Sequence, residues 1–207
     1  MSIRFIFVSL TLLAVCLSLT TPPALSQSVL DTNGNPLKRG TNYYIKPAIT
    51  DNGGRFTLIN RNGSCPLYVG LENTDLPKGL PVTFTPYAKE DNVIKVNRDF
   101  KVSFSASTIC VQSTEWLLGQ NDTKSGRRVI ITGKGEGRGF GNYFRIVEGK
   151  NAGIYNIQWC PTEVCPTCRF ICGTASGLRE GGGQKDPNSK ILLALDGGVL
   201  PVQFIKK

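Results

Sequence analysis

The chain has 207 residues, a formal net charge of +9 and no histidine. Without histidine the usual Ser-His and Cys-His catalytic pairs cannot form, so the composition argues against an enzyme. The basic residues are spread along the chain, and no basic stripe, recognition helix or stacking motif accompanies them, which argues against a nucleic-acid partner. Neither a metal nor another cofactor is expected.

The N-terminal segment has the features of a secretory signal peptide. One arginine, Arg4, precedes an apolar run from Ile6 to Leu19, and a small-residue cleavage site follows at 24–26. The run has about fourteen residues, whereas a membrane-spanning helix needs about 20. Residues 1–26 are therefore predicted to be removed, leaving a secreted or vacuolar protein that starts near Gln27 and has no membrane partner.

The remainder, residues 27–207, is predicted to be a single all-β domain. Short apolar runs alternate with clusters of Gly, Asn, Asp and Pro, which is typical of strands joined by turns. In YNIQW the period of two is explicit, with Tyr155, Ile157 and Trp159 on one face. About a dozen such strands indicate a barrel or a sandwich. The segments are YYIKPAI (43–49), RFTLI (55–59), LYVGL (67–71), PVTFTP (81–86), VIKV (93–96), FKVSFS (100–105), EWLLG (115–119), RVIIT (128–132), YFRIV (143–147), YNIQWC (155–160), ILLAL (191–195) and VQFIKK (202–207).

Six cysteines remain once Cys16 is removed with the signal peptide. Four of them lie in CPTEVCPTCRFIC (160–172), whose spacing could suit either an iron–sulfur cluster or disulfides. An even number of cysteines in an oxidising compartment, with no histidine and no second C-x2-C pair, favours disulfides over a metal. Six cysteines permit fifteen pairings, so the count leaves the connectivity open.

Several motifs resemble one family along the whole length after the signal peptide. They are VLDTNGNPLKRGTNYYI (29–45), DNGGRFTL (51–58), CPLYV (65–69), DLPKGLPVTF (75–84), STEW (113–116), WCP (159–161) and PVQF (201–204). The chain is similar in these motifs to the Kunitz soybean-type trypsin inhibitors, especially their miraculin-like branch. The resemblance implies a β-trefoil, in which twelve strands form a six-stranded barrel closed by three hairpins with pseudo-threefold symmetry.

The resemblance also implies the disulfide pairs Cys65–Cys110 and Cys160–Cys172, and in miraculin-like members an inner pair, here Cys165–Cys168. It further implies a monomeric inhibitor of serine or cysteine endopeptidases with a role in plant defence or in control of endogenous proteases. Such an inhibitor presents an exposed loop in the extended conformation of a substrate. An alternative is a non-inhibitory binding or storage protein on the same scaffold, for example one that binds carbohydrate.

The equivalent loop here is TPYAKEDN (85–92), which contains Tyr87, Ala88, Lys89 and Glu90. Alignment of its Pro-Tyr pair with the family places Ala88 at the specificity position and Lys89 one residue later. Lys89 would suit a trypsin-like pocket with a carboxylate at its base, although Glu90 would then follow the scissile bond. Ala88 would suit the small pocket of an elastase-like or subtilisin-like protease, and both alternatives stay open.

Arg39 stands where the family has an asparagine that supports this loop from inside. A long cationic side chain cannot both donate and accept hydrogen bonds as a compact amide does, so weak support of the loop is expected.

Three further sets of residues are candidates. The glycine-rich segments 133–142 and 172–190 are predicted to be loops, and the second offers Arg179 and Lys185 as an alternative basic site. Asn62 and Asn121 head Asn-x-Ser/Thr sequons and are predicted to be glycosylated.

Overall fold

A computed structural model describes residues 27–49, 53–61, 63–73, 78–110, 112–135, 139–181 and 189–207. Within these ranges the chain forms strands and one short 3-10 helix, with no α-helix and no helix able to cross a membrane. The strands are β1 (Tyr43–Pro47), β2 (Phe56–Ile59), β3 (Tyr68–Leu71), β4 (Val82–Pro86), β5 (Asp99–Phe104), β6 (Trp116–Asn121), β7 (Arg128–Thr132), β8 (Phe144–Glu148), β9 (Tyr155–Trp159), β10 (Gly173–Thr174), β11 (Ser176–Glu180), β12 (Lys190–Ala194) and β13 (Val202–Lys206), and the 3-10 helix is η2 (Phe140–Asn142).

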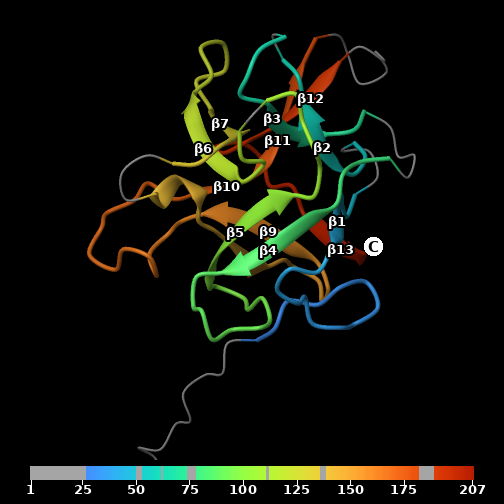
Figure 1. Cartoon of the computed structure of the whole chain (residues 1–207), viewed down its shortest axis with the longest axis vertical. Coiled ribbons are helices and arrows are strands. Elements are labelled where there is room, and N and C mark those ends of the chain that lie inside the picture. Colours follow the sequence, from blue (N-terminus) through green and yellow to red (C-terminus); the bar gives the residue numbers. More distant parts are fainter. Residues whose placement is uncertain are drawn as a thin grey trace, which may run out of the picture.

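Six strands close into a barrel in the lower half of the view in Figure 1. Around the barrel the antiparallel order is β1, β4, β5, β8, β9 and β13, and β13 pairs back onto β1. Inward and outward residues alternate along these strands, as the period of two predicts. In β9 the side chains of Tyr155, Ile157 and Trp159 are all buried, so the pattern in YNIQW is confirmed.

Three hairpins cap the barrel in the upper half of Figure 1: β2–β3, β6–β7 and β11–β12. Their inner strands also pair with one another, β12 with β3, β3 with β7, and β12 with β7, so the cap is triangular. One pair of barrel strands and one cap hairpin therefore repeat three times. This architecture is the β-trefoil that the resemblance implied, with the two-residue strand β10 added beside β9.

Aromatic side chains fill the junction of barrel and cap. Trp116 is fully buried, stacks on Phe56 with ring centroids 5.8 Å apart, and meets the edge of Phe144 at 5.8 Å. Inside the barrel, Phe84 makes edge contacts with Phe100 and Phe204. Such pairs stabilise by about 0.5–1.5 kcal/mol each beyond the area they bury, so the loops of the molecule project from a rigid frame.

Two expectations about the elements are wrong. The segment VIKV (93–96) is no barrel strand, because Val93 and Lys95 make only isolated bridges, to Lys38 and Ser28. Ile94 and Val96 are nevertheless buried in the core, and a buried loop and a strand leave the same pattern in the sequence. Conversely, the predicted loop 172–190 contains β10, which pairs with β9, and β11, which pairs with β12 over five residues; this pairing holds a stretch that has little apolar signal of its own.

Candidate functional site

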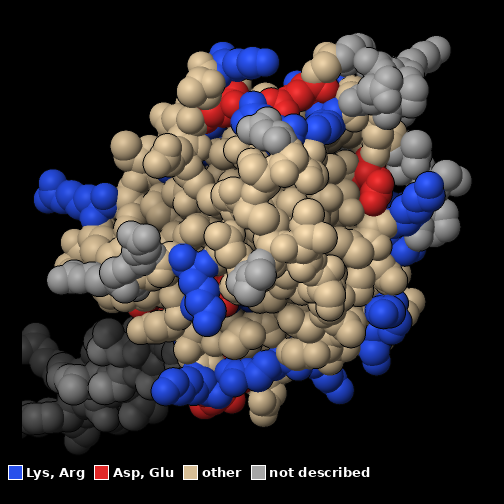
Figure 2. Space-filling view, turned by 45° about the horizontal axis from the view of Figure 1, so that its top comes forward, with Lys and Arg blue, Asp and Glu red and all other residues tan. Residues whose placement is uncertain are grey.

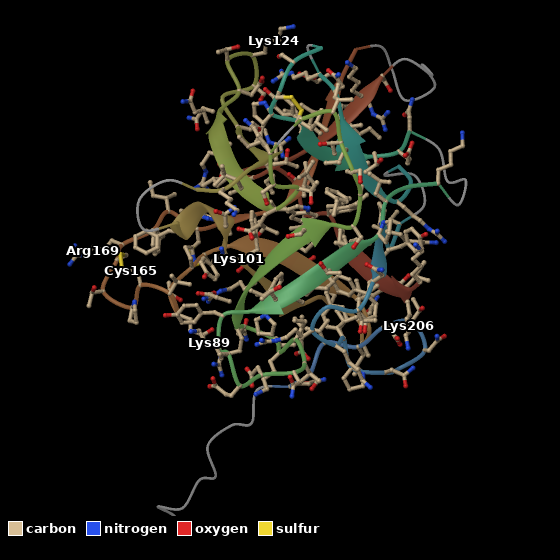
Figure 3. All side chains as sticks on the ribbon, in the orientation of Figure 1. Lys89, Lys101, Lys124, Cys165, Arg169 and Lys206 are labelled. Carbon is tan, nitrogen blue, oxygen red and sulfur yellow. A yellow bond between two sulfur atoms is a disulfide. The ribbon has the colours of Figure 1, made fainter. Side chains whose placement is uncertain are left out.

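The loop between β4 and β5 begins with an exposed turn. The backbone N–H of Asp91 donates to the carbonyl of Ala88 at 3.2 Å, and Lys89 and Glu90 lie at the centre of that turn. Both central side chains are exposed, and Figure 3 shows Lys89 at the outer end of the loop, beyond β4. Ala88 is half-buried. The extended, substrate-like backbone that the resemblance implied is therefore replaced by a turn at these residues.

Arg39 holds this turn from inside. Its Nε donates to the carbonyl of Asp91 at 3.1 Å, and one terminal nitrogen donates to the carbonyls of Ala88 and Lys89 at 3.0 and 2.9 Å. The expectation that an arginine would support the loop poorly is wrong. The groups to be satisfied are all carbonyl oxygens, so only donors are needed, and a guanidinium carries five of them in a planar fork.

Two other contacts fix the loop, and sequence reasoning found neither. The ring of Tyr87 meets the edge of Tyr143 with centroids 5.5 Å apart, and Tyr143 in turn lies under the amine of Lys101 at 5.0 Å. The carboxylate of Asp91 forms an ion pair with Lys95 at 2.6 Å. The acidic group of Asp91 is thus directed to Lys95, which leaves Glu90 as the exposed acidic neighbour of Lys89.

Three disulfides staple the described part of the chain: Cys65–Cys110, Cys160–Cys172 and Cys165–Cys168. They are the pairs that the resemblance implied. The four cysteines of residues 160–172 therefore form two disulfides and do not hold an iron–sulfur cluster. Because all six cysteines in the described part of the chain are in disulfides, none of these six supplies a thiolate for a metal. The described residues also contain no group of three or more potential Cys, Asp or Glu ligands.

The comparisons with known proteins agree with this architecture. The Kunitz legume family model, described as "trypsin and protease inhibitor", matches residues 29–206. The chain belongs to this family. Among its Kunitz relatives is "Kunitz type trypsin inhibitor 106" of Medicago truncatula, which is 54% identical over 212 residues and covers the whole of both chains. Miraculin of Synsepalum dulcificum is 33% identical, with 84% of this chain and 83% of miraculin covered.

A solved Kunitz structure supports the same assignment. The rice bifunctional alpha-amylase/subtilisin inhibitor from Oryza sativa aligns with a TM-score of 0.69 at 33% identity, covering 88% of this chain and all of that chain. The β-trefoil described above is thus found in a relative of known structure.

The remaining predicted residues of this Kunitz chain are placed as follows. Arg179 lies on β11, is half-buried and donates to Asn73 and Ser189, so the expectation that it belongs to a basic loop is wrong. Asn121 is exposed at the end of β6, and its glycosylation stays a prediction. Asn62, Lys185 and the predicted signal peptide lie outside the described residues.

A polar depression of 640 Å³ lies on the cap, but its two acidic groups, Asp122 and Glu180, are already paired with Arg61. Arg61 donates to Asp122 at 2.5 Å and also to Glu180. The hydrogen bond from Arg61, followed by the one from the backbone of Ser125, holds the pKa of Asp122 far below its usual range. Elsewhere the basic side chains are scattered over the face seen in Figure 2 and form no single stripe there. Neither feature singles out a ligand site.

Proposed function

We propose that this chain inhibits serine endopeptidases by binding them with the loop 87–92, without catalysing a reaction itself. The observation that carries the proposal is the set of three hydrogen bonds from Arg39 to the carbonyls of an exposed loop. A loop ordered before binding loses less conformational entropy on association, so more of its contact energy appears as affinity. The family and the relatives named trypsin inhibitors support the same function.

Of the two candidate specificity residues, the geometry favours Lys89. Its side chain is exposed at the tip of the loop, whereas Ala88 is half-buried. The Ala88 carbonyl already accepts hydrogen bonds from Asp91 and Arg39, and a carbonyl oxygen has two lone pairs. It would have to give up both bonds before it could accept the two N–H groups of a protease oxyanion hole, whereas the Lys89 carbonyl would have to give up only the one from Arg39.

The test is a panel of inhibition assays against trypsin, chymotrypsin, subtilisin and elastase with the wild type, Lys89→Ala and Ala88→Arg. If Lys89 fills a carboxylate pocket, Lys89→Ala raises the inhibition constant of this loop more than about tenfold, a loss of about 1.4 kcal/mol. If Ala88 is the specificity residue, Ala88→Arg creates the trypsin binding and Lys89→Ala changes little. A wild type that inhibits no protease of the panel would contradict the function and favour a binding or storage role.

The proposal includes secretion. Three disulfides in one chain are typical of proteins that fold in an oxidising compartment. Expression with the native leader in plant cells, followed by N-terminal sequencing of the exported protein, should find a first residue near Gln27. A product retained in the cytosol with Met1 intact would contradict this part of the proposal.

A further inference from the structure

The segment between β9 and β10, residues 160–172, carries two of the three disulfides and is called the disulfide loop below. It projects from the side of the barrel in Figure 1, beyond η2, well apart from the labelled cap strands. Figure 3 shows Arg169 and Cys165 at its outer end. The Cys160–Cys172 disulfide closes the base of the loop, and the Cys165–Cys168 disulfide lies inside it.

Arg169 differs from the other described arginines. Each of the others makes a hydrogen bond, an ion pair or a contact with an aromatic ring. Arg169 is exposed, and no such contact within the described part of the chain engages it. A guanidinium is available at this position for an external partner, in a protein that uses its other described arginines internally.

The chain around Arg169 shows two features of an extended segment. Residues 168–172 form neither a turn nor a bend, and exposure alternates from Cys168 to Ile171: Arg169 is exposed, Phe170 is half-buried and Ile171 is 83% exposed. Such alternation is typical of extended chain. Among the described residues no donor reaches the Arg169 carbonyl, in contrast to the Ala88 carbonyl, which accepts two hydrogen bonds.

The extended segment is anchored on its inner side. The Phe170 ring packs edge-on against Trp159 at 5.3 Å and against Phe140 of η2 at 5.6 Å. Arg128 donates to the carbonyl of Ile171 at 2.6 Å. Two residues later, at Gly173, the backbone passes close to the same arginine: a Cβ on Gly173 would lie 2.6 Å from a terminal nitrogen of Arg128. The residues that follow Arg169 are therefore held in place.

The first half of the loop is fastened to the barrel through Asp99 of β5. The side chain of Asp99 is fully buried and accepts the backbone N–H groups of Glu163 and Val164 at 2.8 and 3.1 Å. Arg145 donates to the same carboxylate at 2.6 Å. Glu163 completes the attachment by accepting from Arg98 at 2.5 Å. Both ends of the disulfide loop are thus ordered before any partner binds.

We propose that Arg169 is the specificity residue of a second protease-binding site, which takes a serine endopeptidase of trypsin-like specificity. The proposal rests on the proposed inhibitory function. A guanidinium forms two parallel hydrogen bonds with a carboxylate at the base of such a pocket. The unoccupied Arg169 carbonyl can enter the oxyanion hole, and the anchored Phe170 limits the entropy that binding costs.

The disulfides also explain how cleavage at this site would leave the protein intact. Hydrolysis of the Arg169–Phe170 bond consumes one water, breaks the C–N bond and leaves a carboxylate on Arg169 and an amine on Phe170. Cys160 lies before this bond and Cys172 after it, so their disulfide would keep the two new ends together. The cut chain stays one molecule, and the ends remain placed for resynthesis.

The decisive experiment measures inhibition of trypsin by Lys89→Ala and by the double variant Lys89→Ala/Arg169→Ala. We expect Lys89→Ala to keep inhibiting trypsin, and the added Arg169→Ala to raise the inhibition constant by about a hundredfold or more. Arg169→Lys should restore most of the affinity, because a lysine also reaches the pocket carboxylate. The matched control is Lys124→Ala in the same background, which removes an exposed cation from the β6–β7 turn at the far end of the molecule in Figure 3. Equal unfolding temperatures of the four proteins would exclude a folding defect.

Each other outcome separates this inference from the proposed function. If Lys89→Ala alone abolishes trypsin inhibition, or if Arg169→Ala changes the inhibition constant less than about threefold, the second site is refuted while the function stands. The same holds if the wild type inhibits subtilisin or elastase but not trypsin. If the wild type inhibits no serine endopeptidase, both the proposed function and the second site are refuted.

A second measurement does not depend on inhibition constants. Incubation of the wild type with catalytic amounts of trypsin, followed by mass spectrometry, should find the addition of one water without loss of mass, and reduction should then release the peptide that starts at Phe170. A first cut after Lys89, or random cuts after other exposed lysines, would overturn the assignment of Arg169.

Discussion

The loop 87–92 and the disulfide loop both project from the barrel, and they are held by different physical means. In the first, one guanidinium donates to the three carbonyls of Ala88, Lys89 and Asp91. In the second, two disulfides, the packing of Phe170 and the buried carboxylate of Asp99 fix an extended segment. Hydrogen bonds from inside leave the first loop's carbonyls occupied, whereas covalent bonds and side-chain packing leave the Arg169 carbonyl unoccupied.

This difference matters because an inhibitory loop has to be both rigid and accessible. In the loop 87–92 a carbonyl has to give up its hydrogen bond from Arg39 before it can enter an oxyanion hole. Disulfides and aromatic packing hold the disulfide loop without using the Arg169 carbonyl. The predictions that follow alter one of these supports at a time, from the largest expected effect to the smallest.

Asp99→Ala should have the largest effect on stability. It leaves the Arg145 guanidinium and the N–H groups of Glu163 and Val164 without their buried acceptor, which costs about 3–5 kcal/mol of unfolding free energy. Chemical denaturation would measure this loss. The control is Glu115→Ala, whose partner Lys101 is 31% exposed and which should cost under about 1 kcal/mol. Equal losses would show that Asp99 does not fasten the disulfide loop to the barrel.

Replacing the cysteine pairs with serine should separate stability from inhibition. The Cys65–Cys110 disulfide spans 45 residues, so its loss should cost about 4 kcal/mol, without changing trypsin inhibition by the protein that remains folded. The Cys165–Cys168 disulfide spans 3 residues, and its loss should cost only about 2 kcal/mol. This second change should nevertheless weaken trypsin binding about tenfold, because the segment before Arg169 loosens. The reverse pattern would contradict the role given to the disulfide loop.

Arg39→Ala should loosen only the loop 87–92. Without the guanidinium the carbonyls of Ala88, Lys89 and Asp91 lose their donors, and exchange of the Asp91 amide hydrogen should accelerate about tenfold. Arg39→Lys should not restore slow exchange, because one amine cannot reproduce the planar fork. Trypsin binding through Arg169 should be unchanged in both variants. A loss of that binding would show that the two loops act as one site.

The smallest effect should appear in acid. Burial opposes ionisation of Glu163, but the hydrogen bonds from Arg98 and from the backbone of Asp99 outweigh it and lower the pKa of Glu163. A lowered pKa in the folded state stabilises at pH values above the unfolded-state value of about 4.3, and this stability is lost as pH falls further. Because Arg98 is 38% exposed, the contribution should stay below about 1 kcal/mol.

Unfolding temperatures of the wild type and Glu163→Gln between pH 7 and pH 3 would measure that contribution. The gap between the two proteins should be widest near pH 7 and should close as the pH approaches 3. A gap that stays constant over this range would mean that the ion pair with Arg98 does not help to hold the disulfide loop.

Much of the fold could be predicted from the sequence. The period-two pattern of YNIQW identifies a barrel strand directly, and most of the other barrel strands bury alternate residues in the same way. The pattern failed where tertiary contacts override local signals. VIKV looks like a strand because Ile94 and Val96 are buried in the core, although the segment makes only isolated bridges to Ser28 and Lys38. Conversely, β11 forms because β12 offers it a partner along its whole length.

The sequence by itself determined the all-β architecture, the disulfide framework and the exposed basic loop at Lys89, since these depend on residue type, period and motif order. Only the tertiary structure decided which basic side chains make contacts within the protein and which are exposed to an external partner. Arg39 and Arg169 look alike in the sequence, but Arg39 lies within reach of three carbonyls that are 49 to 52 residues away along the chain. Arg169 is kept exposed because Phe170, its neighbour, turns inward to Trp159. Hydrogen-bond partners across such separations are set by the closure of the barrel, and no local pattern encodes them.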